Sequence, residues 1–306
     1  MKLKARNHLV RSRISSFKRQ AQSANRPIPS QYVVGVVLVV IAAVTYSTAG
    51  LFTKGVAAGS WEVIFWRGVF AAAFTTAWTI NRRAFRQNFF AMGYSGWAVG
   101  IVGAVGTAAF IPAFKLTSIA NVSLIYAVAP LIAALLAWIW IGERASRRTM
   151  AGCVLALGGV AIIVSGSLGQ VSLNGDLLAL VMTTAMAAIM VIYRKYPNTP
   201  GAGPAVLQSI FLLLVAALLG SPFHVDPIEV AILAAFGLLF AIASVTLAEG
   251  AKRVPSGQTA LLSALETPLA PIFAFMLFAE VPSLATFLGG SVVLLAVLLS
   301  IKNETR

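Results

Sequence analysis

The sequence predicts an all-α polytopic membrane protein with ten transmembrane helices, arranged as two inverted five-helix repeats. Three observations support this fold class: the composition, the number of apolar segments and the distribution of basic residues. Of the 306 residues, 59% are hydrophobic and only 10% are charged, whereas soluble domains carry about 25% charged residues. This number of charged side chains is too small to cover a surface that faces water. The composition therefore indicates a protein embedded in lipid.

Ten apolar segments recur along the chain, and each is close to the roughly 20 residues that cross a hydrocarbon core of about 30 Å. The predicted spans cover residues 32–53, 61–80, 96–114, 119–141, 149–167, 173–193, 204–220, 228–250, 257–279 and 284–301. Their connections are short and often contain Gly, Pro or Ser, as in PNTPGAG at 197–203. No soluble domain fits between the spans.

Lysine and arginine residues test this assignment, because cytoplasmic loops collect them. With both termini inside, 20 of the 23 basic residues fall on the cytoplasmic side. Lys54 and Lys115 fall on the other side, and Arg67 lies within a span. A missed or extra helix would destroy this alternation, so the pattern predicts ten spans with cytoplasmic termini.

Residues 1–30 form a basic tail without an acidic residue. Val10, Ile14, Phe17 and Ala21 recur in it at helical spacing, which is typical of an amphipathic segment on anionic lipid. Its Arg- and Ser-rich composition is also typical of an organellar transit peptide. We favour a bacterial inner membrane, with an organellar membrane as the alternative.

The two halves of the chain resemble each other when one is shifted by 137 residues. The shift aligns Lys115 with Lys252, Glu143 with Glu280, Ser146 with Ser283 and Gly152 with Gly289. Each half contains five spans, an odd number, so the second must enter the membrane with the opposite orientation. This predicts inverted repeats at 31–168 and 173–301, the architecture of many secondary transporters.

The segments APLIAALLAWIWIGERAS and ETPLAPIFAFMLFAEVPS carry a family resemblance. Each has a proline within a span, then Gly-Glu or Ala-Glu, a Ser, and a Gly nine residues after the Glu. This pattern resembles the duplicated EamA domain of the drug/metabolite transporter superfamily. The resemblance implies a ten-helix carrier, commonly an exporter of amino acids, related metabolites or drugs. The first span reads TYSTAGLF where relatives often have Trp-Gly, which leaves the substrate open.

The ninth span contains a carboxylate, Glu266, nine residues beyond Gly257. At 1.5 Å per residue this is about 13 Å into the membrane, near the midplane. A charge there costs roughly 2.5–3.5 kcal/mol even on lenient insertion scales. We expect Glu266 to face an internal cavity, protonated in one state and ionised in another. The alternative is that an arginine or hydroxyl groups hold it and that it only joins helices.

Two prolines follow this carboxylate. Pro268 and Pro271 each remove a helix hydrogen bond, so we expect the carbonyls of Ala264 and Thr267 to lose their donors. Such backbone is tolerated where protein or a wet cavity satisfies it. The prolines therefore favour a cavity beside the ninth span.

The fourth span contains the equivalent break at Pro130, but Ala129 stands where Glu266 stands in the second half. Asn121 and Tyr126 supply polar groups on the same span, and Ser263 does so beside Glu266. Either these side chains contact substrate, or they serve helix packing at about 0.6 kcal/mol each.

Arg67 is the one basic residue well inside a predicted span. It could bind a substrate carboxylate in bidentate fashion, pair with Glu266, or extend to the membrane interface. Its equivalent in the second half falls near Gln208, which is polar but neutral. A site built on Arg67 and Glu266 would therefore be asymmetric.

Hydroxyl groups cluster in the first span, where Tyr46 stands with Thr45, Ser47 and Thr48. Each either contacts substrate or bonds to its own helix. Glu143 and Glu280 end the fourth and ninth spans, and we expect both to be structural caps of the helices that follow.

These features predict a secondary transporter, most simply an exporter of amino acids, related metabolites or drugs, with alternating access around a midplane cavity and proton coupling through Glu266. The alternatives are an uncoupled facilitator and a membrane scaffold or receptor subunit. The chain has no GxxxxGK[ST] loop, and no catalytic pair lies within a span. We therefore expect no enzyme activity, cofactor, metal or nucleotide.

The expected partners are a small-molecule substrate, lipid and protons, but not nucleic acid, because basic residues outside the tail are scattered over the short loops. The sequence leaves the substrate, the direction of transport and the oligomeric state open.

Overall fold

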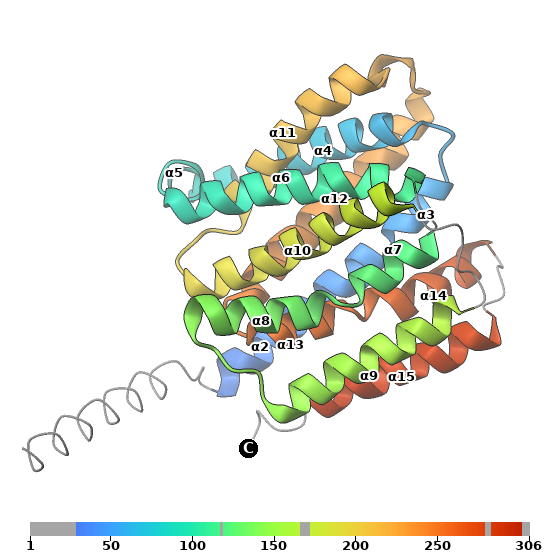
Figure 1. Ribbon diagram of the computed structural model, residues 1–306. Coiled ribbons are helices and arrows are strands. Elements are labelled where there is room, and N and C mark those ends of the chain that lie inside the picture. Colours follow the sequence, from blue (N-terminus) through green and yellow to red (C-terminus); the bar gives the residue numbers. More distant parts are fainter. Residues whose placement is uncertain (1–28, 117–118, 166–171, 279–282, 302–306) are drawn as a thin grey trace, which may run out of the picture.

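The computed structural model describes residues 29–116, 119–165, 172–278 and 283–301, and the regular structure within them is helical (Figure 1). Seven helices in this part of the chain are long and apolar enough to cross a membrane, and Gln31–Ser47 is a shorter apolar helix. The predictions for the basic tail and for Glu280 lie outside the described residues.

The first half supplies five of the predicted spans. Its helices are α2 (Pro29–Ser47), α3 (Ala49–Lys54), α4 (Ser60–Asn81), α5 (Phe85–Phe89), α6 (Gly93–Leu116), α7 (Ile119–Tyr126), α8 (Ala129–Ile141) and α9 (Arg147–Val164). The predicted first span is divided into α2 and α3 at Thr48, and the predicted fourth span into α7 and α8.

The second half supplies the other five. Its helices are α10 (Leu173–Lys195), α11 (Ala202–Leu219), the 3-10 turn η1 (Pro222–His224), α12 (Pro227–Ala251), α13 (Ser256–Ser263), α14 (Glu266–Phe278) and α15 (Leu284–Ile301). The predicted ninth span is divided into α13 and α14.

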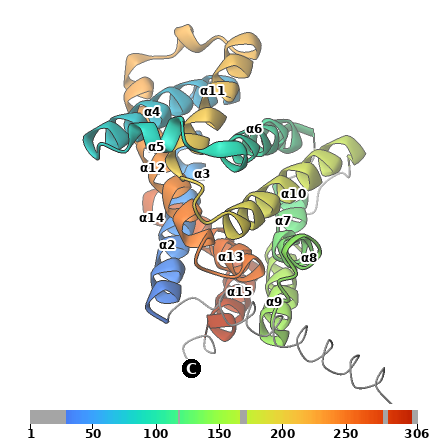
Figure 2. The same ribbon diagram turned by 90° about the vertical axis from the view of Figure 1, so that its left-hand side faces the viewer.

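The packing of the helices follows the duplication (Figure 2). Helix α2 packs on α12 as α10 packs on α6, and α4 packs on α12 as α11 packs on α6. The pairs α4–α11 and α9–α15 each join equivalent helices of the two halves, and α8 of the fourth span packs on α13 of the ninth. Exchanging the halves reproduces the contacts of α2, α4, α10 and α11 with α12 and α6, as well as the α4–α11 and α9–α15 pairs, as expected of an inverted repeat.

The breaks in the fourth and ninth spans occupy equivalent positions. Helix α7 ends at Tyr126 and α13 at Ser263, and 263 − 126 = 137, the offset of the sequence repeat. Each second segment carries a proline in its first turn, where a missing N–H costs little.

The hydrogen bonds at the ninth-span break differ from those predicted. The Ala264 carbonyl accepts a bond from the Thr267 N–H at 3.1 Å, and the Leu265 carbonyl from the Leu269 N–H at 3.2 Å. The prediction that Ala264 lacks a donor was therefore wrong. A tighter i to i+3 turn supplies the partner that Pro268 cannot.

Burial changes sharply along the ninth span. All eight residues of α13 are buried, whereas Glu266, Thr267 and Leu269 in α14 are only partly so. Gln258, which is 1% exposed, donates hydrogen bonds to the Tyr32 hydroxyl at 2.7 Å and the Ser300 carbonyl at 2.9 Å. The α13 end of the bundle is therefore closed by packing that joins both halves.

Small residues allow α9 and α15 to approach closely. A Cβ atom added at Gly159 would lie 2.7 Å from the Gly289 carbonyl oxygen, and one at Gly289 would overlap the Gly159 carbonyl. The neighbouring Gly158 faces open space. Close backbone approach of this kind is a common basis of helix association in lipid.

We expect Gly159→Ala to destabilise the protein by about 1–3 kcal/mol, because the added methyl group forces the two helices apart. The matched control is Gly158→Ala, which meets no neighbour and should leave stability equal or slightly higher. Thermal unfolding of the purified variants in detergent measures both. Equal midpoints for the two variants would contradict this account of the contact.

Candidate functional site

Four side chains singled out by the sequence come together in the interior. Tyr46 of α2, Arg67 of α4 and Tyr126 of α7 belong to the first half, and Glu266 of α14 belongs to the second. Tyr46 lies close enough to the other three for electrostatic interaction, and Tyr126 contacts Glu266. We call these four residues the central cluster.

Glu266 is the first residue of α14, so its carboxyl group lies beside the positive end of that helix dipole. Its contact is with the phenol of Tyr126, which is placed to donate a hydrogen bond to the carboxyl group. The described part of the chain contains no ion pair to Glu266. The alternative in which an arginine holds this carboxyl is therefore not observed, whereas a hydroxyl contact is.

Arg67 turns toward α12. Its guanidinium carbon lies 4.3 Å from the centre of the Phe240 ring and 5.5 Å from that of Phe236. Cation–π contacts of this kind contribute up to about 2 kcal/mol when they are desolvated. Arg67 therefore neither pairs with Glu266 nor extends to the membrane interface.

The Nε atom of Arg67 is buried and has no hydrogen-bond partner among the described residues. Leaving a buried donor unsatisfied costs about 1–3 kcal/mol. An acceptor atom brought by a ligand would remove this cost, so the arrangement is suited to a carboxylate or a carbonyl group.

Tyr46 is tied to α12 as well. Its hydroxyl oxygen is 3.1 Å from Ser244 Oγ, and its ring meets the Phe240 ring edge-on at 5.8 Å. Phe240 therefore contacts both Tyr46 and Arg67. The neighbouring Thr45, Ser47 and Thr48 donate hydrogen bonds to backbone carbonyls three or four residues earlier in the chain, at 2.6–2.7 Å. Of the two roles considered for these hydroxyls, substrate contact or bonding to their own helix, the structure shows the second.

The remaining predicted site residues make other contacts or cannot be described. Gln208 Nε2 donates to Thr107 Oγ1 at 2.9 Å and so joins α11 to α6. The Ser263 hydroxyl donates to the Thr259 carbonyl of its own helix at 3.0 Å. The side chains of Asn121 and Pro271 lie outside the described residues. Pro130 and Pro268 are buried, and their role in lining a cavity stays a prediction.

Sequence reasoning missed the residues of α12 that support the central cluster. Phe236, Phe240 and Ser244 recur at intervals of four, which places them on one face of the helix. That spacing was the available signal. Nothing local, however, distinguishes this stripe from an ordinary packing face.

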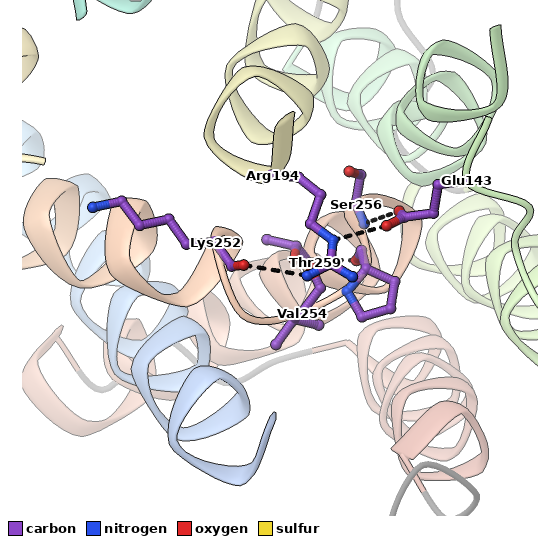
Figure 3. Close-up of polar contacts among 7 residues, drawn as sticks. Glu143, Arg194, Lys252, Val254, Ser256 and Thr259 are labelled. Carbon is purple, nitrogen blue, oxygen red and sulfur yellow. Dashed lines mark hydrogen bonds and ion pairs between the residues drawn. The ribbon is translucent and has the colours of Figure 1, made fainter. Parts of the chain in front are cut away.

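A second polar group lies at the end of the bundle that carries the arginine-rich connections, which we call the basic face. Figure 3 shows the Glu143 carboxylate between Arg194 and the Ser256 backbone. It accepts hydrogen bonds from Arg194 Nε and from the Ser256 backbone N–H, each at 2.8 Å. Arg194 also donates to the Lys252 carbonyl at 3.2 Å. We call this network the basic-face latch, because Glu143 belongs to the first half and its partners to the second.

Glu143 therefore caps a different helix from the one expected. Ser146 caps the following helix α9 by accepting from the Thr149 N–H at 3.1 Å. The Glu143 carboxylate instead stands at the first turn of α13, where the helix dipole favours a negative charge. The correction follows from tertiary proximity, because Glu143 and Ser256 are 113 residues apart.

Carboxylates also join the halves at the opposite face. Glu62 of α4 accepts from the Ser221 N–H at 2.6 Å. Glu229 of α12 accepts from the N–H groups of Ala57 and Ala58 at 2.6 and 3.1 Å. Each carboxylate thus holds a loop of the other half. At the basic face, Glu249 forms ion pairs with Lys252 and Arg253 of the same half.

Comparisons with known proteins agree with the fold. The model of the EamA-like transporter family matches residues 33–165 and 173–302, which confirms the resemblance found in the sequence. Among curated protein sequences, none matches significantly. A protein of known crystal structure superposes with a TM-score of 0.77 at 20% identity, over 88% of this chain and 96% of its own. At that identity the likeness concerns the fold alone.

We expect Glu143→Gln and Arg194→Gln each to destabilise the protein by about 1.5–3 kcal/mol, the usual contribution of hydrogen bonds to charged groups. The double variant should lose less than the sum, because the shared ion pair is lost only once. Thermal unfolding in detergent measures this coupling.

Arg86→Gln is the control, since Arg86 is exposed and makes no ion pair in the described part of the chain. It should change stability by less than about 0.5 kcal/mol. Strictly additive losses at Glu143 and Arg194 would rule out the latch as a coupled unit.

Proposed function

Since the chain belongs to the EamA-like transporter family, which is not an enzyme family, we propose that it is a secondary exporter of amino acids, related small metabolites or drugs. Family membership implies a small-molecule substrate that crosses a membrane. The direction of transport, the substrate class and the coupling are the proposed parts.

The central cluster is the observation that carries this proposal. It combines an acid from the second half with an arginine and two tyrosines from the first. A substrate bound there would touch both halves, so its binding would depend on how the halves are placed. This dependence is what alternating access requires of a central site.

The contacts at the basic face support a rocking motion of one half against the other. The basic face is closed by the buried helix α13 and by the basic-face latch. Opening this face would separate Glu143 from Arg194 and Ser256. If basic loops mark the cytoplasm, the structure is closed toward the cytoplasm, and we propose a bacterial inner membrane, with an organellar membrane as the alternative.

Glu266 is the proposed proton-coupling group. It contacts a phenol and forms no ion pair with the residues that the structure describes, so no fixed cation among them holds its charge constant. A substrate cation or a proton could then occupy the same carboxyl group in alternation. The proposed cavity beside α14 would provide the water path for this exchange.

We expect Glu266→Gln to lose accumulation driven by a pH gradient while it retains substrate exchange, because the amide keeps the shape but cannot bind a proton. The measurement uses proteoliposomes, a panel of radiolabelled amino acids and the cationic dye ethidium. Full gradient-driven accumulation by Glu266→Gln would remove the coupling role. A wild-type protein that equilibrates substrate without responding to the gradient would favour the uncoupled facilitator.

We expect Arg67→Lys to raise the KM for carboxylate-bearing substrates about ten- to a hundredfold, because a lysine cannot reproduce the planar, bidentate guanidinium. Uptake by the same proteoliposomes measures it. Arg82→Lys makes the matched change at an exposed connection and should leave KM unchanged. An unaltered KM in Arg67→Lys would remove Arg67 from the substrate site.

A further inference from the structure

An open groove runs along the outer surface of α9 beside α15, away from the central cluster. Its volume is about 740 Å³. Its lining includes Arg147, Met150, Val154, Gly158 and Ile162 of α9, and Val292 of α15. Apart from Arg147 at one end, these side chains are apolar.

The groove is a consequence of small residues on one face of α9. Gly158 faces open space, while the adjacent Gly159 packs against α15. Met150, Val154 and Ile162 line the groove on either side of Gly158, and 40%, 59% and 39% of their surfaces are exposed. The helix therefore presents one face to α15 and a hollowed apolar face to the lipid.

The basic face of the bundle begins at one end of this groove. Arg144, Arg147 and Arg148 are all exposed, and none forms an ion pair in the described part of the chain. The nearest carboxylate in sequence, Glu143, is engaged by Arg194. Arg147 lines one end of the groove, and Arg144 and Arg148 are within three residues of it in the chain, so three arginines that form no ion pair with the described residues belong to the segment that begins α9.

The length of the groove suits a lipid chain. The 15 residue steps from Arg147 to Ile162 span about 22 Å along a helix. One leaflet of the hydrocarbon core is roughly 15 Å thick, half of about 30 Å. The groove is therefore long enough for an acyl chain that starts from a headgroup at Arg147 and crosses one whole leaflet.

We propose that this groove is a binding site for an anionic phospholipid, with one acyl chain over Gly158 and the phosphate held by Arg144, Arg147 and Arg148. Guanidinium groups bind phosphate oxygens in bidentate fashion. A second copy of the chain fits less well. Two copies in the same membrane orientation, joined through this face, would place their arginines at the same depth and in mutual repulsion.

The test measures lipid retention by native mass spectrometry of the detergent-purified full chain, titrated with phosphatidylglycerol or phosphatidylcholine. We expect phosphatidylglycerol to bind about tenfold more tightly, because each basic residue near an anionic headgroup favours binding severalfold. Phosphatidylglycerol should also raise the thermal midpoint more than phosphatidylcholine does.

Two variants separate the parts of the site. Gly158→Trp fills the groove and should abolish retention of both lipids, while the control Gly158→Ala retains them. The double variant Arg144→Gln and Arg147→Gln should lose the preference for phosphatidylglycerol but still bind both lipids weakly.

Equal retention of the two lipids by the wild type, or unchanged retention in the arginine double variant, would overturn the proposal. A wild-type dimer that Gly158→Trp converts to a monomer would overturn it in favour of a second copy. The arginine variant keeps the test valid if Gly158→Trp fails to fold.

Discussion

The bilayer interior contains no water to satisfy backbone groups or charges, and the arrangement of this protein depends on that constraint. A span can be interrupted only where the protein itself supplies the missing partners. The fourth and ninth spans are interrupted at equivalent positions and pack against each other through α8 and α13. At the ninth-span break, the Ala264 carbonyl finds a donor three residues on. The two interruptions therefore lie at the interface of the halves, which is where a transporter needs backbone that can change.

Two carboxylates differ in how firmly their surroundings fix them. Glu143 and its partner Arg194 have side chains that are 20% and 13% exposed, and the pair adds the Ser256 N–H at the start of a helix. Every oxygen of Glu143 is thus engaged, and its position holds the two halves together. Glu266 has a phenol as its neighbour and no cation paired to it among the described residues. An acid with so few fixed partners can exchange them, whereas Glu143 cannot do so without opening the basic face.

Adjacent glycines on α9 serve two different surfaces. Gly159 allows the α15 backbone to approach, while Gly158 leaves a hollow toward the lipid. The stable α9–α15 pair and the proposed lipid site thus share one helix. The same division appears on α12, where Gly237 approaches the α4 backbone while Phe236 and Phe240 receive the Arg67 side chain. In both helices, a glycine allows a neighbouring backbone to approach closely, and the residues beside it form a different contact surface.

The sequence by itself determined the ten spans, the repeat with its offset of 137 residues, and the approximate positions of the breaks in the fourth and ninth spans, because hydropathy, basic-residue placement and proline chemistry act locally along the chain. It did not indicate the break in the first span at Thr48. It did identify Glu266, Arg67, Tyr46 and Tyr126. Only the tertiary structure decided their partners. Glu143 caps α13 rather than α9, Arg67 stacks on Phe240 rather than pairing with Glu266, and Gln208 joins Thr107 instead of the central cluster. These outcomes depend on which helices are neighbours and how each is rotated about its axis. The sequence of a span that is apolar on all sides does not determine this rotation. Lipid tails and the side chains of other helices are almost equally apolar, so no side of the span clearly favours protein over lipid.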